Sequence, residues 1–476
     1  MVFPVVGGDG KPTGYDIDNS LRFNDGDSAQ LSREFSADPD TRKKFTISFW
    51  VKRGELGSDN AVFGARTTAN FWSRLHFDSS DRIRLQNVAS GSTDIEFEAS
   101  HKLRDPSAWY HIVFAVDTTQ SAISDGVKLY INGTRITDTS STNYSQNATF
   151  EFARNGTTNY IGRDDENSSF FDGYISEFYY VDNQQLAPTA FGETNDNGVW
   201  IPIDAKDDIT FGANGFYLEF KQTGTSQNSS GIGADTSGND EHFAVANLAA
   251  IDVTTDTPTN NFCTWNPLDA ASNISGRFSE GNMDVDVPGN NVVSGAEANG
   301  CLSTIQFSKG KWYFEMKYEY GANGFQDTAG IGLIRTDTGF SIRGSTDTRN
   351  FSDNVFYYVD GPKTIDGTHT SYGDAWTQND IIGVAANLDD DEVYFYKNGT
   401  IQNSGTAISK TFGDGFYSIA NFHGSANGGA LFRLNTGNPS FSISSGNSDA
   451  NGYGNFEYSV PSGYYAICTK NLAQYG

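Results

Sequence analysis

Carboxylates alternate along one short stretch of the sequence, Asp94-Ile95-Glu96-Phe97-Glu98. Alternate residues of a β-strand lie on one face, about 6.6 Å apart along the chain, so these carboxylates would form a row. Retaining glycosidases use two carboxylates separated by about 5 Å, one as nucleophile and one as acid and base. Glycan cleavage by Glu96 and Glu98 is therefore one hypothesis. A strand with Ile95 and Phe97 buried and its carboxylates in solvent explains the same residues without catalysis.

The surroundings of this strand favour binding over catalysis. A glycosidase site needs an enclosing cleft with aromatic rings that stack on sugars, and no Trp lies within ten residues of Glu96. The six histidines show neither a two-His metal spacing nor a nucleophile elbow. We therefore expect no catalytic residue, no defined metal site and no cofactor, and a protein that is not an enzyme.

Two acidic runs could contribute oxygen ligands to calcium, the one metal that the sequence leaves open. Asp164-Asp165-Glu166 follows a predicted strand, and Asp389-Asp390-Asp391-Glu392 precedes one. Neither run has the spacing of a defined calcium loop, and a solvated turn explains both.

Aromatic residues near polar side chains are the other candidates for ligand contact. Sugar-binding sites use rings that stack on the sugar and polar groups that set its orientation. The residues that fit this description, each of which could equally belong to the core, are Trp72 with Arg74, Tyr357 with Tyr358, and Trp376.

The composition indicates an all-β protein of two large domains. The chain has 476 residues, 14% of them aromatic, and 51 glycines that supply turns between short strands. Its net charge of −27 argues against nucleic acid, because phosphate binding needs basic side chains. We also expect no membrane insertion, no signal peptide and no disulfide framework among the cysteines Cys263, Cys301 and Cys468.

Alternating runs define the strands of the first domain, expected over residues 15–203. The strongest signal is a hairpin at Asn132-Gly133, because an Asn-Gly pair between alternating runs suits a two-residue turn. The runs SFWVKR, WYHIVFAVD, KLYINGTRI and FDGYISEFYYVD resemble laminin G-like modules of the concanavalin A type. Laminarinase-type enzymes of that fold carry a strand with Glu, Asp and Glu in order. Here the first two types are exchanged, at Asp94 and Glu96, which weakens the hypothesis of catalysis.

A second domain is expected over residues 278–441. Its runs KWYFEMKYE, AGIGLIR, DIIGVAANLDDDEVYFYKNGTI and ALFRLNTGNPSF resemble a SPRY domain, which is also a concanavalin A-like sandwich. The fold class is thus two tandem antiparallel β-sandwiches of the jelly-roll type. We expect an N-terminal arm over residues 1–14, an irregular connector over 204–277 and a C-terminal tail over 442–476 that packs on or near the second domain. The segment HFAVANLAAID in the connector fits a helix or a strand equally well.

The two modules, the connector run TNNFCTWNPLD and the ending GYGNFEYSVPSGYYAICTKNL together resemble structural proteins of marine tailed phages, of the tail fibre, receptor-binding or capsid fibre type. That resemblance implies a virion protein assembled in the bacterial cytoplasm, a trimer, with other virion proteins and a host surface glycan or protein as partners. Two alternatives remain: a capsid decoration protein, and a glycan depolymerase that uses Asp94, Glu96 and Glu98.

Overall fold

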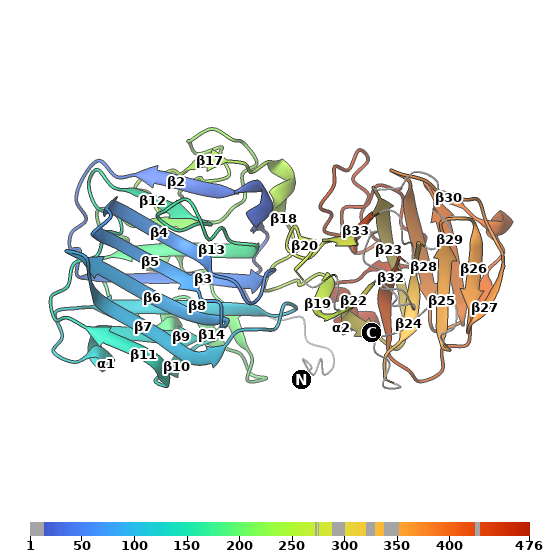
Figure 1. The fold of residues 1–476 in the computed structure, drawn as a ribbon, viewed down its shortest axis with the longest axis horizontal. Coiled ribbons are helices and arrows are strands. Elements are labelled where there is room, and N and C mark those ends of the chain that lie inside the picture. Colours follow the sequence, from blue (N-terminus) through green and yellow to red (C-terminus); the bar gives the residue numbers. More distant parts are fainter. Residues whose placement is uncertain are drawn as a thin grey trace. The chain divides into compact units, whose positions relative to one another are not determined.

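The computed structural model describes residues 14–271, 274, 276–287, 300–319, 329–337, 352–423 and 429–476. The chain forms two compact units, Pro12–Thr259 and a second that contains Asn260–Gly476, which we call the N-terminal and C-terminal domains. Figure 1 draws the first in blue to green and the second in yellow to red. Each is built from antiparallel sheets around a hydrophobic core, which confirms the predicted tandem sandwiches.

One sheet of the N-terminal domain, here the β3 sheet, has the strand order β10-β9-β8-β3-β13-β1-β18, and β16 also pairs with β13. Its strands are β1 (Ser20–Phe23), β3 (Lys44–Arg53), β8 (Trp109–Asp117), β9 (Val127–Ile131), β10 (Thr134–Ile136), β13 (Gly173–Asp182), β16 (Phe216–Leu218) and β18 (Val253–Thr254).

The facing sheet, here the β5 sheet, has the order β11-β7-β6-β5-β4-β12-β2-β17. Its strands are β2 (Gln30–Glu34), β4 (Asn60–Thr68), β5 (Phe71–Phe77), β6 (Arg82–Ala89), β7 (Ser92–Lys102), β11 (Thr139–Tyr144), β12 (Thr158–Ile161) and β17 (Ala244–Ala246). The remaining elements are β14 (Gly192–Thr194), β15 (Trp200–Pro202), α1 (Ile123–Gly126), η1 (Asp25–Asp27), η2 (Pro188–Ala190), η3 (Lys206–Asp208) and η4 (Ala250–Asp252).

The C-terminal domain repeats this plan. Its β23 sheet has the order β20-β21-β33-β23-β28-β29-β30, joined by β31 and β34, and its β25 sheet has the order β19-β22-β32-β24-β25-β26-β27. The elements are β19 (Trp265–Ala270), β20 (Phe278–Ser279), β21 (Asp284–Val287), β22 (Cys301–Phe307), β23 (Lys311–Tyr318), β24 (Gly330–Arg335), β25 (Asn354–Tyr358), β26 (Pro362–Ile365), β27 (Thr368–Ser371), β28 (Ile381–Asn387), β29 (Glu392–Lys397), β30 (Thr400–Ile401), η6 (Asn403–Gly405), β31 (Ile408–Ser409), β32 (Tyr417–Phe422), β33 (Ala430–Asn435), β34 (Tyr465–Ala466) and α2 (Thr469–Tyr475).

Asn132-Gly133 forms the tight turn that the sequence predicts, and Asn398-Gly399 forms a matching one in the other domain. The φ angles are 47° and 73° at Asn132-Gly133, and 48° and 74° at Asn398-Gly399. Positive φ at both central residues is the type I′ turn, whose twist matches that of the flanking strands. The Asn side chains add a contact that the sequence did not predict. Oδ1 of Asn132 accepts a hydrogen bond from the backbone N–H of His111, and Oδ1 of Asn398 accepts one from that of Ile381.

The segment 204–277, expected to be an irregular connector, is divided between the domains at residue 259. Within the N-terminal domain, β16 pairs with β13, β17 with β2 and β18 with β1, so the segment extends both sheets. Within the C-terminal domain, β19 pairs with β22. The segment HFAVANLAAID forms β17 and η4 and no α-helix. The apolar residues Phe216–Leu218, Phe243 and Leu248 are buried where this segment packs on the sandwich.

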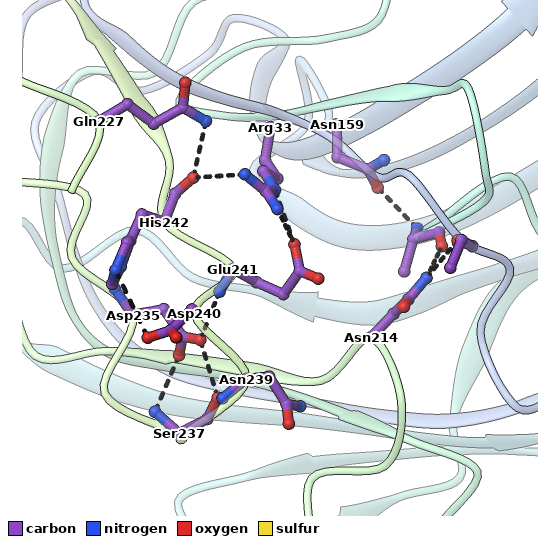
Figure 2. Close-up of polar contacts among 12 residues, drawn as sticks. Arg33, Asn159, Asn214, Gln227, Asp235, Ser237, Asn239, Asp240, Glu241 and His242 are labelled. Atoms are coloured by element: carbon purple, nitrogen blue, oxygen red, sulfur yellow. Dashed lines mark hydrogen bonds and ion pairs between the residues drawn. The ribbon is translucent and has the colours of Figure 1, made fainter. Parts of the chain in front are cut away.

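A polar network holds the 227–242 part of this segment in place (Figure 2). Asp235 accepts hydrogen bonds from the N–H groups of Tyr217, Ser237 and Glu241 and from the Ser237 hydroxyl, all at 2.8 to 2.9 Å. Glu241 pairs with Arg33 of β2 at 2.5 Å. Because one buried carboxylate orders the loop from within, the segment needs no long strand to be well defined.

The residues 442–476 lie against the C-terminal domain. Phe456, Tyr464 and Cys468 are buried with Tyr313 of β23, and β34 adds a parallel pairing to the same strand. The buried Glu315 carboxylate accepts the backbone N–H groups of Glu457 and Tyr458 at 2.9 and 2.8 Å. Strand β23 thus holds this segment through apolar contacts at Tyr313 and hydrogen bonds at Glu315.

The three cysteines are fully buried, and none of them is in a disulfide. Each packs in the C-terminal domain, Cys263 and Cys301 in its main core and Cys468 beneath the C-terminal segment. Among the residues that the structure describes, no helix has the length and apolar character needed to cross a membrane.

Candidate functional site

Trp72 and Arg74 lie together on β5. This strand buries Ser73, Leu75 and Phe77 in the core, so the alternate residues face outward from the sandwich. Both outward side chains are half-buried, and the Arg74 guanidinium carbon lies 5.3 Å from the centre of the Trp72 ring. This cation–π contact holds the indole against the sheet with part of the ring open.

The row of carboxylates on β7 lies on the same outer face. Antiparallel register places Arg74 opposite Gln86 of β6, and Gln86 opposite Glu96 of β7. Ile95 and Phe97 point into the core, 0% and 5% exposed, as the non-catalytic interpretation requires. Two candidates that the sequence presents as unrelated, Trp72 with Arg74 and Glu96 with Glu98, therefore share one surface.

The carboxylates on β7 are paired with arginines instead of standing free in solvent. Glu96 accepts from Arg84 at 2.5 Å and from the Gln86 amide at 3.2 Å, and the Ser141 hydroxyl also donates to it. Glu98 accepts from Arg82 at 3.0 Å. Side-chain exposures of 10% to 14% for the two glutamates show that the network largely shields them.

The pKa of Glu96 fits a carboxylate in an ion pair better than a catalytic acid. Burial pushes the pKa of Glu96 up, but the hydrogen bonds from Ser141 and Arg84 outweigh it and leave the pKa below its ordinary value. A catalytic acid in a retaining glycosidase needs a raised pKa to hold its proton near neutral pH. The environment of Glu96 therefore favours the ionised carboxylate.

The loop after β12 packs against β4 of the same sheet. Asp164 accepts the N–H groups of Glu166 and Ser168 at 2.9 and 2.8 Å, and Asp165 pairs with Arg66 of β4 at 3.2 Å. The loop backbone lies directly on Gly64, where a Cβ would come within 2.9 Å of the Asp165 nitrogen. The first acidic run thus folds the loop onto the sheet.

The second acidic run makes similar contacts around a turn of the C-terminal domain. Asp389 accepts the N–H of Gly310 at 2.8 Å, Asp390 pairs with Lys311 at 2.7 Å, and Asp391 accepts the N–H of Phe412 at 2.9 Å. The described part of the chain holds no group of three or more His, Cys, Asp or Glu side chains arranged for a metal ion.

Tyr357, Tyr358 and Trp376 differ from the sequence-based expectation. All three are 0% exposed. Tyr357 packs against Phe395 and Trp376 in the main core, at ring distances of 5.3 and 6.3 Å, and Tyr358 belongs to a separate buried cluster. Since no part of these rings reaches the surface, they are packing residues and not ligand contacts.

Several residues of the outer face escaped the sequence analysis. Arg84 and Gln86 organise the carboxylates, and the Arg163 guanidinium carbon lies 3.5 Å from the centre of the Tyr160 ring. His76, 1% exposed, completes the row beside Arg84, and burial first and the guanidinium groups of Arg74 and Arg84 next hold its pKa well below the usual value. The alternation Arg82-Ile83-Arg84-Leu85-Gln86 carried a usable signal, because it sets polar residues on one face.

Comparison with known proteins agrees with both folds. Residues 23–184 match the laminin G model of the concanavalin A-like lectin/glucanase superfamily, and residues 311–436 match the SPRY domain model. The chain therefore carries a concanavalin A-like domain followed by a SPRY domain. Such domains are ligand-binding or protein-interaction modules.

Similar individual proteins share only part of the chain. The E3 ubiquitin-protein ligase RKP of Arabidopsis thaliana is 30% identical over 133 residues, 26% of this chain, and the chain spans only 9% of that relative's length. The SPRY domain of human HERC1 has 15% identity and a TM-score of 0.28, over 36% of this chain and 96% of that one. A heptameric SAP-like pentraxin from Limulus polyphemus has 16% identity and a TM-score of 0.27, over 37% of this chain and 80% of that one.

Proposed function

We propose that the protein is a non-enzymatic binding protein whose ligand is a host surface glycan, held on the outer face of the β5 sheet. The observation that supports this most directly is the partly exposed Trp72 side chain beside a network of paired charges on one surface. A ring gives a sugar a stacking platform, and fixed polar groups around it recognise hydroxyls.

The network also indicates which ligands suit the face. Four arginines of this face have carboxylate partners: Arg66 with Asp165, Arg74 with Asp164, Arg82 with Glu98, and Arg84 with Glu96. An anionic ligand would have to displace these carboxylates, whereas a neutral sugar can add hydrogen bonds to charges that are already balanced. A neutral glycan is thus the ligand class that this face favours.

The wider role that we propose comes from the resemblance to phage structural proteins. The protein would be a trimeric virion component of the tail fibre or receptor-binding type, assembled in the bacterial cytoplasm and in contact with other virion proteins. Antibody labelling of intact virions would test this placement: label at the tail supports it, and label over the capsid favours the decoration alternative.

Binding of fluorescent protein to host cells tests the proposed face. We expect Trp72→Ala to weaken binding at least about tenfold, because stacking on one ring contributes on the order of 1 to 3 kcal/mol. Phe416→Ala is the matched control, since it removes a ring that is 46% exposed in the other domain. Equal binding by wild type and Trp72→Ala, with both proteins folded, would contradict the proposal.

The depolymerase alternative needs a separate measurement. The purified protein is incubated with host polysaccharide, and chain length is followed over time. We expect no shortening by the wild type or by Glu96→Gln. Shortening by the wild type that Glu96→Gln abolishes would replace binding with cleavage as the function of this face.

A further inference from the structure

A buried lysine and a buried aspartate meet on the β3 sheet, which the proposed glycan face does not use. In the antiparallel register Lys52 of β3 lies beside Tyr174 of β13 on one side and Trp109 of β8 on the other. Asp256 follows β18, and its Oδ2 lies 2.8 Å from Lys52 Nζ. The two side chains are 1% and 0% exposed, so the pair is shielded from bulk water.

Aromatic rings and one indole N–H contact this pair. Trp109 and Tyr174 belong to one buried aromatic cluster, and Lys52 Nζ lies 5.5 Å from the centre of the Tyr174 ring. Trp109 Nε1 donates a hydrogen bond to Asp256 Oδ1 at 3.1 Å. The Ser20 hydroxyl donates to the backbone oxygen of Asp256 at 2.6 Å and holds the backbone of the aspartate in place. The amine thus contacts one carboxylate oxygen and the indole N–H the other.

This environment favours neutral groups over ions. Burial penalises both the ammonium and the carboxylate, and the attraction between them regains only part of that cost. Transfer of a proton from Lys52 Nζ to Asp256 Oδ2 gives an amine and a carboxylic acid, which apolar surroundings accept more readily. Because the fold holds the two groups in contact, a reaction between them needs no encounter step and is strongly accelerated.

We propose that Lys52 and Asp256 join in an isopeptide bond, a covalent modification that the folded chain forms without another reagent. The neutral Nζ attacks Cγ of Asp256, so an N–C bond forms and the C–Oδ2 bond breaks. Oδ2 leaves as water with two of the three ammonium protons, and Nζ keeps the third as the amide hydrogen. Nothing is oxidised or reduced. The Trp109 N–H stabilises the negative charge on Oδ1 while Cγ is tetrahedral, as an oxyanion-hole donor does.

The bond fastens the C-terminal end of the N-terminal domain. Asp256 lies just before residue 259, where the chain passes to the C-terminal domain. Lys52 lies on β3, which is paired on both sides, whereas β18 is a strand of two residues. A pull on the chain beyond the domain therefore acts on a covalent link to β3 instead of on the few hydrogen bonds of β18.

Intact mass and a tryptic peptide map of the full-length protein test the bond. We expect a mass one water molecule below that of the unmodified chain. Acylation of Lys52 blocks tryptic cleavage after it, so residues 45–53 should appear joined to residues 222–277. A map in which these two peptides are separate would overturn the proposal, and so would a lost water located at another aspartate.

Two variants identify the lysine that reacts. Lys52→Met should restore the lost water. Lys410→Met is the matched control, because the Lys410 side chain is also 1% exposed but its partners Asp353 and Asp366 are 38% and 46% exposed. The water loss should persist in this control, and its persistence in Lys52→Met would overturn the proposal. The peptide map of the wild type is informative whether or not Lys52→Met folds.

A third variant tests the part played by the indole. Trp109→Phe keeps an aromatic ring but removes the N–H that contacts Asp256 Oδ1. Bond formation, followed by mass in samples taken at intervals after synthesis, should slow by about a hundredfold, as loss of one oxyanion-hole donor does. Formation at the wild-type rate would overturn the role assigned to Trp109.

Discussion

The two domains share one topology but carry opposite chemistry on equivalent faces. The order β10-β9-β8-β3-β13-β1-β18 in one matches β30-β29-β28-β23-β33-β21-β20 in the other, and β4-β5-β6-β7 matches β24-β25-β26-β27. On the β5 sheet the outer face holds arginines, glutamates and Trp72. On the β25 sheet the outer residues Leu302, Ile334, Phe356, Tyr358 and Phe422 form a buried apolar cluster.

This difference shows how one fold supports different roles. The inward residues are mostly apolar in both domains because they fill the space between the sheets. The outward residues carry no such demand, so their chemistry is set by what covers or binds the face. Trp72 and Phe356 occupy outward positions on equivalent strands, β5 and β25, yet one is half-buried and the other is 0% exposed.

The largest expected effect is a loss of stability when a ring is removed from the buried apolar cluster on the β25 sheet. Phe356→Ala should lower the free energy of unfolding by about 3 to 5 kcal/mol, because it leaves a cavity in a fully buried cluster. Trp72→Ala should cost much less, since its ring is only partly buried. Urea unfolding of both variants measures the contrast, and similar losses would remove the distinction between a packed face and a binding face.

A smaller effect should appear in the pH dependence of stability, and here the domains should behave alike. Burial raises the pKa of Glu177 in one domain and of Glu315 in the other from 4.5 to about 7. The folded state then holds a proton that the unfolded state has lost, so stability should fall as pH rises from 4.5 to about 7. Glu177→Gln and Glu315→Gln should each flatten part of this slope in melting curves. If the dependence of stability on pH is unchanged in both variants, the raised pKa values of Glu177 and Glu315 are contradicted.

The smallest effect concerns the matched hairpins. Asn132→Ala and Asn398→Ala should each cost about 1 kcal/mol, because alanine tolerates positive φ poorly and lacks the oxygen that accepts the N–H of His111 or Ile381. Since the turns have nearly the same angles, the two losses should be similar. Thermal unfolding of the two variants measures them, and a large loss at one turn alone would show that the hairpins are not equivalent.

Much of the fold could be predicted because its long strands alternate and its turns carry Asn-Gly. Segment 204–277 could not, because β16 and β17 are three residues long and β18 is two, too short for a period to show. Their positions depend on pairing with strands far away in sequence and on Asp235, whose role is visible only once the loop has closed around it.

The candidate site could be predicted in pieces but not as a whole. Trp72 with Arg74 and Glu96 with Glu98 were each visible as patterns, yet only the register through Gln86 brings them onto one surface. Tyr357 and Trp376 show the opposite limit. A buried aromatic residue, whether on a strand like Tyr357 or in a loop like Trp376, has the same sequence signature as one that stacks on a ligand.

The buried thiols have a practical consequence for measurement. Burial raises the pKa of Cys468 to about 12 and that of Cys301 well above its ordinary value. Maleimide dyes attack thiolates, so the folded native chain should be almost inert toward them. A single cysteine placed by mutation at the edge of the β5 sheet could then carry a dye to one chosen position, which would let ligand contact be followed optically without removing any native residue of the core.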